Sequence, residues 1–172
     1  MIKTSRLIVR KFEITDAPDL YEYLSDPATY IFEPGQPISL DEAKELARER
    51  SQGDNFWAVL LKEEKKLIGH LYLGNVEPRD QLTWELGYIF NRKYQGKGYA
   101  SEAAAALVEH AFSHLPVHRI MARCNPQNIA SWRLLERIGF TREGYFREHS
   151  FMHRDESGKP MWTDAYEYSR LG

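Results

Sequence analysis

In the stretch NRKYQGKGYASEAAAALVEHAF, residues Asn91–Phe112, a glycine-containing loop is predicted to run into a helix. Gly96 and Gly98 are followed by about three turns of alanine and other good helix formers. A loop that opens a helix presents unpaired backbone N–H groups beside the positive end of the helix dipole, and such groups bind phosphate or pyrophosphate. The alternative is a tight turn in which glycine only relieves backbone strain.

The segments around this stretch predict a single mixed α/β (α+β) domain that spans residues 1–172. Apolar runs between turn residues predict strands at Arg6–Phe12, Phe56–Leu61, Leu67–Val76, Thr83–Phe90 and Val117–Cys124, with two more after Gly139. Apolar residues at helical spacing predict helices from Thr15 to before Pro27, from Ser39 to near Gly53, from about Tyr99 to His114 and from Asn128 to Ile138. The middle three strands are expected to be antiparallel.

Composition disfavours several classes of protein. Hydrophobic residues make up 42% of the chain and aromatic residues 13%, which is enough for one sizeable core. The formal charge of −2 provides no overall field that would gather nucleic acid or anionic lipid, so neither is an expected partner. Cys124 is the only cysteine, and His114 and His118 lack metal-ligand spacing to any acid, so we expect neither a disulfide nor a metal. No apolar run approaches the roughly 20 residues that cross a bilayer, and we expect a cytoplasmic protein without membrane contact.

Two familiar phosphate-binding patterns do not fit the loop. The Walker pattern requires glycine and Ser or Thr at the places where Asn91 and Gly98 stand. The dinucleotide fingerprint requires a small Gly or Ala where Ser101 stands, and an acid that binds the ribose about 20 residues further on. No Asp or Glu occurs between Glu109 and Glu136, so NAD binding is not expected.

A third pattern does fit, and it continues downstream. Gln95, Gly98 and Ala100 match the spacing Q/R-x-x-G-x-G/A, and NIASWRLLERIGF, Asn128–Phe140, matches an asparagine followed by a helix that ends in E-[KR]-x-G-F. With these two motifs the chain resembles the GNAT superfamily of acyl-CoA N-acyltransferases. The stretches SRLIVRKFEITDAPDLYEYLSDP, ELGYIFNRKYQGKGYASEA and GKPMWTDAYEYSRL resemble the branch that contains the ribosomal-protein N-terminal acetyltransferases. The resemblance covers nearly the whole chain.

The resemblance implies a GNAT-like, mostly antiparallel sheet of about seven strands, splayed in the middle and flanked by about four helices. It also implies that acetyl-CoA is the cosubstrate and that no metal takes part. The pyrophosphate would lie on the loop residues Gln95, Gly96, Lys97, Gly98, Tyr99 and Ala100, and the pantetheine along an exposed strand edge that ends at Ile89 and Phe90. Asn128 would contact the pantetheine, and Arg92, Lys93 and Lys97 would pair with phosphate groups, unless these cations are only solvated surface residues.

Acetyl transfer to an amine requires a base, because most of the amine is protonated at neutral pH. Glu85 is the first candidate, because it lies on the strand expected to splay. Strand alternation places Glu85, Gly87 and Ile89 on one face, where the glycine leaves room for a substrate, and Trp84, Leu86 and Tyr88 on the other. The alternatives are a structural ion pair of Glu85 with an arginine, or His70 and Tyr72 as other catalytic candidates. A backbone N–H near Ile89 or Phe90 would stabilise the oxyanion.

The usual acid of the superfamily, a tyrosine seven residues after the asparagine, is absent, because that position holds Leu135. In the ribosomal-protein branch a serine serves instead, and Ser131 stands at its place. Ser131 and Asn128 can also have structural roles, as a hydroxyl that satisfies the first turn of a helix and as its N-cap. A covalent role for Cys124 is disfavoured, since the family transfers the acetyl group directly to the amine.

These interpretations predict an N-acetyltransferase that acts through a ternary complex, as a monomer or homodimer. The acceptor is a protein N-terminal α-amine or, alternatively, a small amine, amino acid or antibiotic, and a CoA-binding module without activity is a further alternative. The acceptor site is expected to be built from the segments Thr29–Ser39 and Phe146–Trp162. Aromatic residues of these segments and of nearby strands are candidates for it: Tyr30, Phe32, Trp57, Tyr72, Phe151 and Trp162.

Overall fold

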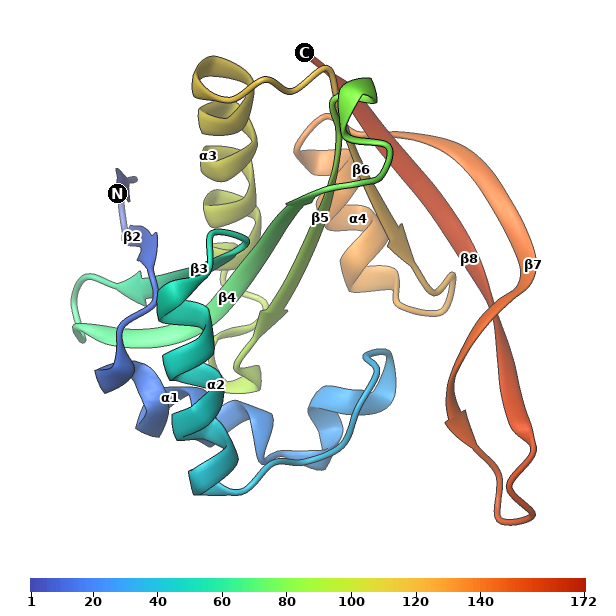
Figure 1. Ribbon diagram of the computed structural model, residues 1–172, viewed down its shortest axis with the longest axis horizontal. Helices are drawn as coiled ribbons and strands as arrows, with labels where there is room; N and C mark the ends of the chain where they lie inside the picture. The colour runs from blue at the N-terminus through green and yellow to red at the C-terminus, as the bar shows by residue number, and fades with distance from the viewer.

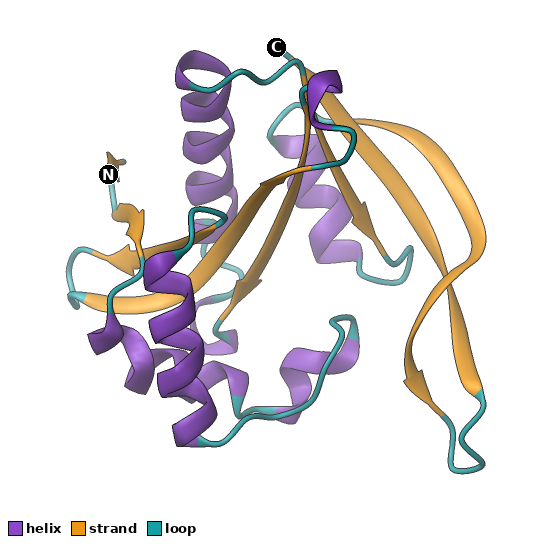
Figure 2. Ribbon diagram, viewed as in Figure 1, coloured by secondary structure: helices purple, strands orange, loops and turns teal.

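The computed structural model describes residues 1–172 as one eight-stranded sheet with helices on both faces (Figures 1 and 2). The strands, in the spatial order β1-β2-β3-β4-β5-β6-β8-β7, are β1 (Ile2–Lys3), β2 (Leu7–Lys11), β3 (Phe56–Leu61), β4 (Lys66–Asn75), β5 (Thr83–Phe90), β6 (Arg119–Cys124), β7 (Thr141–Arg154) and β8 (Pro160–Leu171). The helices are α1 (Ala17–Leu24), α2 (Leu40–Gln52), α3 (Tyr99–His114) and α4 (Ile129–Arg137).

The predicted mixed fold, its helices and its mostly antiparallel sheet are confirmed, with one strand more than expected. The additional strand is β1, which pairs with β2 through Ile2↔Val9 and Lys3↔Ile8. A strand of two residues has no alternation that a sequence pattern can reveal. None of the helices combines the length and the apolar character of a membrane-spanning helix.

The sheet divides between β5 and β6, the one parallel pair. These strands pair only at Thr83↔Arg119, Trp84↔Ile120 and Glu85↔Met121. Beyond that point β5 stays paired with β4 as far as Gly69↔Phe90, whereas β6 stays paired with β8 as far as Cys124↔Tyr166. The edge of β5 from residue 86 to residue 90 therefore has no neighbouring strand, and Figure 1 shows the two halves of the sheet diverging there.

Each face of the sheet has its own hydrophobic core. The larger cluster joins the sheet to α3 and α4, and it includes Leu86 and Phe90 of β5. The smaller cluster joins the sheet to α1 and α2, and Ile89 packs against it. The side chains of β5 therefore alternate as predicted, with Tyr88 on the α3/α4 side and Ile89 on the α1/α2 side.

A buried ion pair connects β2 to the start of α1. Asp16 is buried, its carboxylate accepts hydrogen bonds from Arg10 at 2.8 and 2.9 Å, and it also accepts one from the Glu13 N–H at 2.8 Å. Lys11 and Asp54 form a comparable pair at 2.9 Å, but the Asp54 side chain is 95% exposed.

We predict that Asp16→Ala lowers the free energy of unfolding by about 3 kcal/mol, because the arginine loses its buried partner. Asp54→Ala, the matched control, should change it little, because exposed pairs contribute little. Urea unfolding followed by circular dichroism measures both. Equal effects of the two substitutions would show that the buried Arg10–Asp16 pair contributes no more to the free energy of unfolding than the exposed pair.

Candidate active site

The loop between β5 and α3 has backbone N–H groups that the protein itself leaves free. Gly96 and Gly98 adopt φ values of +75° and +81°, a left-handed conformation that glycine reaches without steric cost. The N–H of Glu102 donates to the Gly98 carbonyl at 3.0 Å, but the N–H groups of residues 96–101 donate to no protein acceptor. They surround the N-terminus of α3, where the helix dipole favours an anion.

The outer side of this loop is fastened to the chain's N-terminal segment. The Arg6 guanidinium donates to the Lys97 carbonyl at 3.0 Å and to the Glu102 carboxylate at 2.7 Å. Glu102 also accepts a hydrogen bond from Thr4 at 2.6 Å, and on the other side of the loop the Gln95 amide donates to the Phe90 carbonyl at 2.9 Å. The loop is thus held in place before any ligand arrives.

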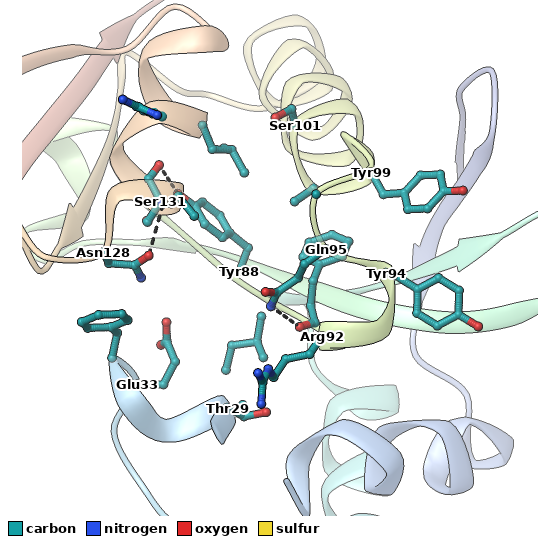
Figure 3. A pocket seen from close by; sticks show the side chains of 18 of the residues that line it. Thr29, Glu33, Tyr88, Arg92, Tyr94, Gln95, Tyr99, Ser101, Asn128 and Ser131 are labelled. Carbon is teal, nitrogen blue, oxygen red and sulfur yellow. Dashed lines mark hydrogen bonds between the residues drawn. The ribbon is translucent and has the colours of Figure 1, made fainter. Parts of the chain in front are cut away.

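A cavity of about 470 Å³ lies between this loop, the open end of β5, α4 and residues 28–33 (Figure 3). Most of the predicted cofactor-binding residues line it, namely Ile89, Phe90, Arg92, Gln95, Gly96, Gly98, Tyr99, Ala100 and Asn128, together with Ser131 and Phe32. The other predicted site residues do not line it, namely Glu85, Lys93, Lys97, Tyr30, Trp57, Tyr72, Phe151 and Trp162.

Ser131 is hydrogen-bonded to a residue that the sequence analysis did not select, Tyr88. The Tyr88 hydroxyl lies 2.9 Å from Ser131 Oγ and 3.2 Å from the Ser131 carbonyl oxygen. Burial raises the pKa of Tyr88, so its hydroxyl keeps its proton at neutral pH. Asn128 is the predicted N-cap of α4, since its side chain accepts a hydrogen bond from the Ser131 N–H at 3.3 Å.

The sequence indicates the strand face on which Tyr88 lies but not the residue that it contacts. Strand alternation placed Tyr88 on the face opposite Glu85, and Leu135 left the usual tyrosine position without a hydroxyl. The pairing of Tyr88 with Ser131 spans 43 residues of sequence, so only the packing of α4 against β5 brings the two hydroxyls together.

The two residues named as alternatives to Glu85 have aromatic partners within the protein. His70 is buried, its Nδ1 lies 2.7 Å from the Tyr23 hydroxyl, and burial lowers its pKa well below the usual value. Tyr72 packs against Phe56 with ring centroids 5.2 Å apart. Glu85 itself is half-buried, lies opposite Gly74 in β4, and has no hydrogen bond or ion pair with an arginine. Its catalytic role stays a prediction.

The predicted cations differ in what they contact. Arg92 lines the cavity, 3.9 Å from Asp26, whereas Lys93 pairs with Glu22 at 2.7 Å and Lys97 lies over the Tyr94 ring. Two further cations line the cavity from α4, Arg133 and Arg137, and the guanidinium of Arg137 donates to Ser101 Oγ at 2.8 Å. Arg133 and Arg137 are four residues apart on the predicted helix after Asn128, and this spacing indicates that they share one face of that helix.

Of the predicted acceptor-site aromatics, only Phe32 lines the cavity. The Tyr30 hydroxyl donates to the Leu24 carbonyl at 2.8 Å, and Trp57 packs against His110 of α3 with ring centroids 6.0 Å apart. Phe151 packs against Trp162 within the β7–β8 hairpin at 5.2 Å. The acceptor roles of these residues stay predictions.

Glu33 is the ionisable residue of the cavity that the sequence analysis passed over. It is half-buried at the cavity wall, and its burial raises its pKa to about 7. No local pattern marks it, because it lies in the irregular segment between α1 and α2.

The comparisons with known proteins agree with this geometry. A family described as the acetyltransferase (GNAT) domain matches residues 6–141. The uncharacterized N-acetyltransferase YnaD of Bacillus subtilis (strain 168) is 38% identical over 99% of this chain and 96% of its own length. The [ribosomal protein uS5]-alanine N-acetyltransferase of Escherichia coli (strain K12) is 31% identical over 86% of this chain and 81% of its own. The crystal structure of a GNAT-family acetyltransferase from Bacillus anthracis superimposes with a TM-score of 0.88 at 35% identity, over 99% of this chain and 97% of that one.

The splayed sheet, the loop of free amides and these matches define an N-acetyltransferase fold. The chain belongs to the GNAT family of acetyltransferases, within which it resembles the ribosomal-protein acetyltransferases.

Cys124 provides a test of the direct-transfer mechanism. Burial raises the pKa of its thiol to about 11, although a hydrogen bond with Ser131 opposes the shift. A group with that pKa is only about 0.1% thiolate at pH 8, whereas an ordinary cysteine with a pKa of about 8.5 is roughly one quarter thiolate. We predict that iodoacetamide at pH 8 alkylates the folded protein at least about 100 times more slowly than the urea-unfolded protein. Equal rates in mass spectrometry would contradict this and would reopen a covalent role for Cys124.

Proposed function

We propose that this protein transfers the acetyl group of acetyl-CoA directly to a primary amine, and that the acceptor is the α-amine of a protein N-terminus. The observation that carries the proposal is the row of free N–H groups at residues 96–101, next to a strand edge that no other strand occupies. A pyrophosphate can accept hydrogen bonds from these N–H groups. An extended arm that contains amides, such as pantetheine, can form hydrogen bonds along the open strand edge. Acetyl-CoA has both parts.

The cations of the cavity support the same ligand. Arg92, Arg133 and Arg137 line its wall, and guanidinium groups bind phosphate through paired hydrogen bonds. Arg137 already contacts Ser101 in the first turn of α3, so it stands beside the free amides. Lys93 and Lys97 stay proposed as outer phosphate contacts.

The hydroxyl pair at the other end of the cavity supports the chemistry. When the amine nitrogen forms its bond to the thioester carbonyl, the carbon–sulfur bond breaks and a thiolate leaves. Ser131 Oγ, hydrogen-bonded to the protonated Tyr88, is the donor we propose for that sulfur. Tyr88 thus stands in for the tyrosine that Leu135 replaces, and this removes the main reason to expect a CoA-binding module without activity.

A protein N-terminus is favoured by the name of the E. coli relative, which specifies an alanine of ribosomal protein uS5. A small amine is the alternative acceptor. The proton acceptor is proposed to be a carboxylate, and the two candidates are Glu85 at the point where β5 and β6 separate and Glu33 in the cavity.

We predict that acetyl-CoA at about 100 times its dissociation constant stabilises the protein by about 2.7 kcal/mol, measured as a rise in melting temperature. Gly96→Leu should abolish this rise, because the added side chain occupies the space over the amides. Gly158→Leu is the matched control: both glycines have positive φ, and at both the space that a Cβ would enter is open to a radius of 4 Å. Both variants lose about 1–2 kcal/mol from backbone strain, but only the first should lose the ligand response. A wild-type protein that gives no rise with any acyl-CoA would refute the proposal.

Ser131→Ala and Tyr88→Phe should each lower kcat by about tenfold or more, while the stabilisation by acetyl-CoA remains, because each removes a hydroxyl but no cofactor anchor. The double variant should be little slower than the worse single variant, since the two hydroxyls act as one unit. Release of CoA with a panel of peptides, polyamines and amino acids measures the rates. Full activity of both single variants would exclude the hydroxyl pair as the proton donor.

A further inference from the structure

One carboxylate of the cavity differs from nearly all others in the protein. Each of the acidic side chains that is buried or half-buried has a cation or a hydrogen-bond donor beside it, with two exceptions, Glu33 and Glu85. A desolvated carboxylate without a partner costs stability. Of the two, only Glu33 lines the cavity.

Glu33 faces the hydroxyl pair across this space. Its side chain extends from the segment after α1 toward the start of α4, where Asn128 and Ser131 lie, and Tyr88 reaches Ser131 from β5 (Figure 3). It is close enough to Tyr88 for its charge to contribute to the raised pKa of that hydroxyl. Residues of β5 and of α4 therefore line this part of the cavity together with one unpaired carboxylate.

The other charged groups of the cavity leave Glu33 unpaired. Arg92 lies 3.9 Å from Asp26, Arg137 contacts Ser101, and Arg133 lies beside the Trp132 ring. None of these guanidinium groups forms an ion pair with Glu33. Burial is the sole cause of the raised pKa of Glu33, so no protein charge already fills the place of a cation there.

We propose that Glu33 receives the ammonium group of the acceptor and takes one of its protons, an inference that rests on the acetyl-transfer function proposed above. In this step R–NH3⁺ and the Glu33 carboxylate become R–NH2 and the carboxylic acid. The nitrogen lone pair then attacks the thioester carbonyl, the carbon–sulfur bond breaks, and the thiolate receives a proton through Ser131. The second proton lost by the nitrogen replaces the one that Ser131 gave to the sulfur. Glu33 then releases its proton to water, so that R–NH3⁺ and acetyl-CoA give R–NH–CO–CH3, CoA-SH and H⁺.

The acid–base balance of this step favours one class of amine. An α-ammonium has a pKa of about 8, one unit above the pKa of about 7 that burial gives Glu33, so the equilibrium constant for proton transfer to Glu33 is about 0.1. For a lysine ammonium, with a pKa of about 10.4, this equilibrium constant is below about 0.001. The cavity should therefore acetylate α-amines well and lysine side chains poorly.

The test compares Glu33→Gln with Glu63→Gln, an exposed glutamate in the β3–β4 turn that has no hydrogen bond or ion pair. The substrates are a peptide with a free N-terminal alanine and a peptide with an acetylated N-terminus and one lysine. We expect Glu33→Gln to lose at least about 100-fold in kcat/KM on the alanine peptide at pH 7, and to regain much of it at pH 9, where the amine is already neutral. Glu63→Gln should match the wild type at both pH values, and the lysine peptide should be the poorer substrate of the wild type.

The pH dependence of the melting temperature shows whether Glu33 is a buried carboxylate without a partner. A carboxyl group whose pKa is raised in the folded state stabilises the protein below its unfolded pKa of about 4.5, and that contribution is lost as the pH rises through about 7. Glu33→Gln should therefore have a higher melting temperature than the wild type at pH 8, and the two should converge near pH 4.5. The same variant should keep its full stabilisation by acetyl-CoA.

Several results would overturn the proposal. A Glu33→Gln variant with the wild-type rate and pH profile would exclude it. So would a pH–rate profile whose rise near pH 7 is lost in Glu85→Gln but kept in Glu33→Gln. A melting temperature of Glu33→Gln that does not exceed that of the wild type at pH 8 would also count against it. In these cases the wild type still releases CoA, so acetyl transfer stands. A wild type that binds acetyl-CoA but acetylates no amine would refute the proposed function itself and Glu33 with it.

Discussion

The strands β5 and β6 separate after three paired rows, and both the cavity and the open strand edge follow from that separation. Each strand also pairs with another neighbour, β5 with β4 along its whole length and β6 with β8 as far as Cys124. The two strands pair with each other only as far as Glu85↔Met121. The remaining edge of β5 has no strand to pair with, although the Gln95 amide donates to the Phe90 carbonyl, and a cavity takes the place where a neighbouring strand would lie.

The loop after β5 uses the same principle of unsatisfied backbone groups. A helix always begins with N–H groups that lack partners inside the helix, and proteins commonly satisfy them with a capping side chain. Here the N-cap position of α3 holds Gly98, which offers no side chain, whereas α4 is capped by Asn128. The difference leaves the amides of α3 free for a ligand, and Arg6 holds their loop from outside.

Burial, more than charge, sets the protonation states around the cavity. It keeps the Tyr88 hydroxyl and the Cys124 thiol protonated, and it moves Glu33 into the range in which a carboxyl group exchanges protons at neutral pH. In the proposed mechanism the Tyr88–Ser131 hydroxyl pair is the proton donor at one wall of the cavity, and Glu33 is the proton acceptor at another. The same effect makes His70 a neutral partner of Tyr23 within the core.

Local signals in the sequence determined the elements that hold the site. Glycines that need positive φ, an asparagine cap and the alternation of β5 each act over a few residues, so the loop, the start of α4 and the two faces of the strand could be predicted. Tertiary structure alone decided which side chains meet. The hydroxyls of Tyr88 and Ser131 are 43 residues apart in sequence, Glu33 enters the cavity from an irregular segment, and Trp57 packs against His110 of α3 and does not line the cavity. The two-residue strand β1 also exists only because β2 offers it an edge. Such contacts and the loss of water around them depend on how distant elements pack, and no short stretch of sequence carries that information.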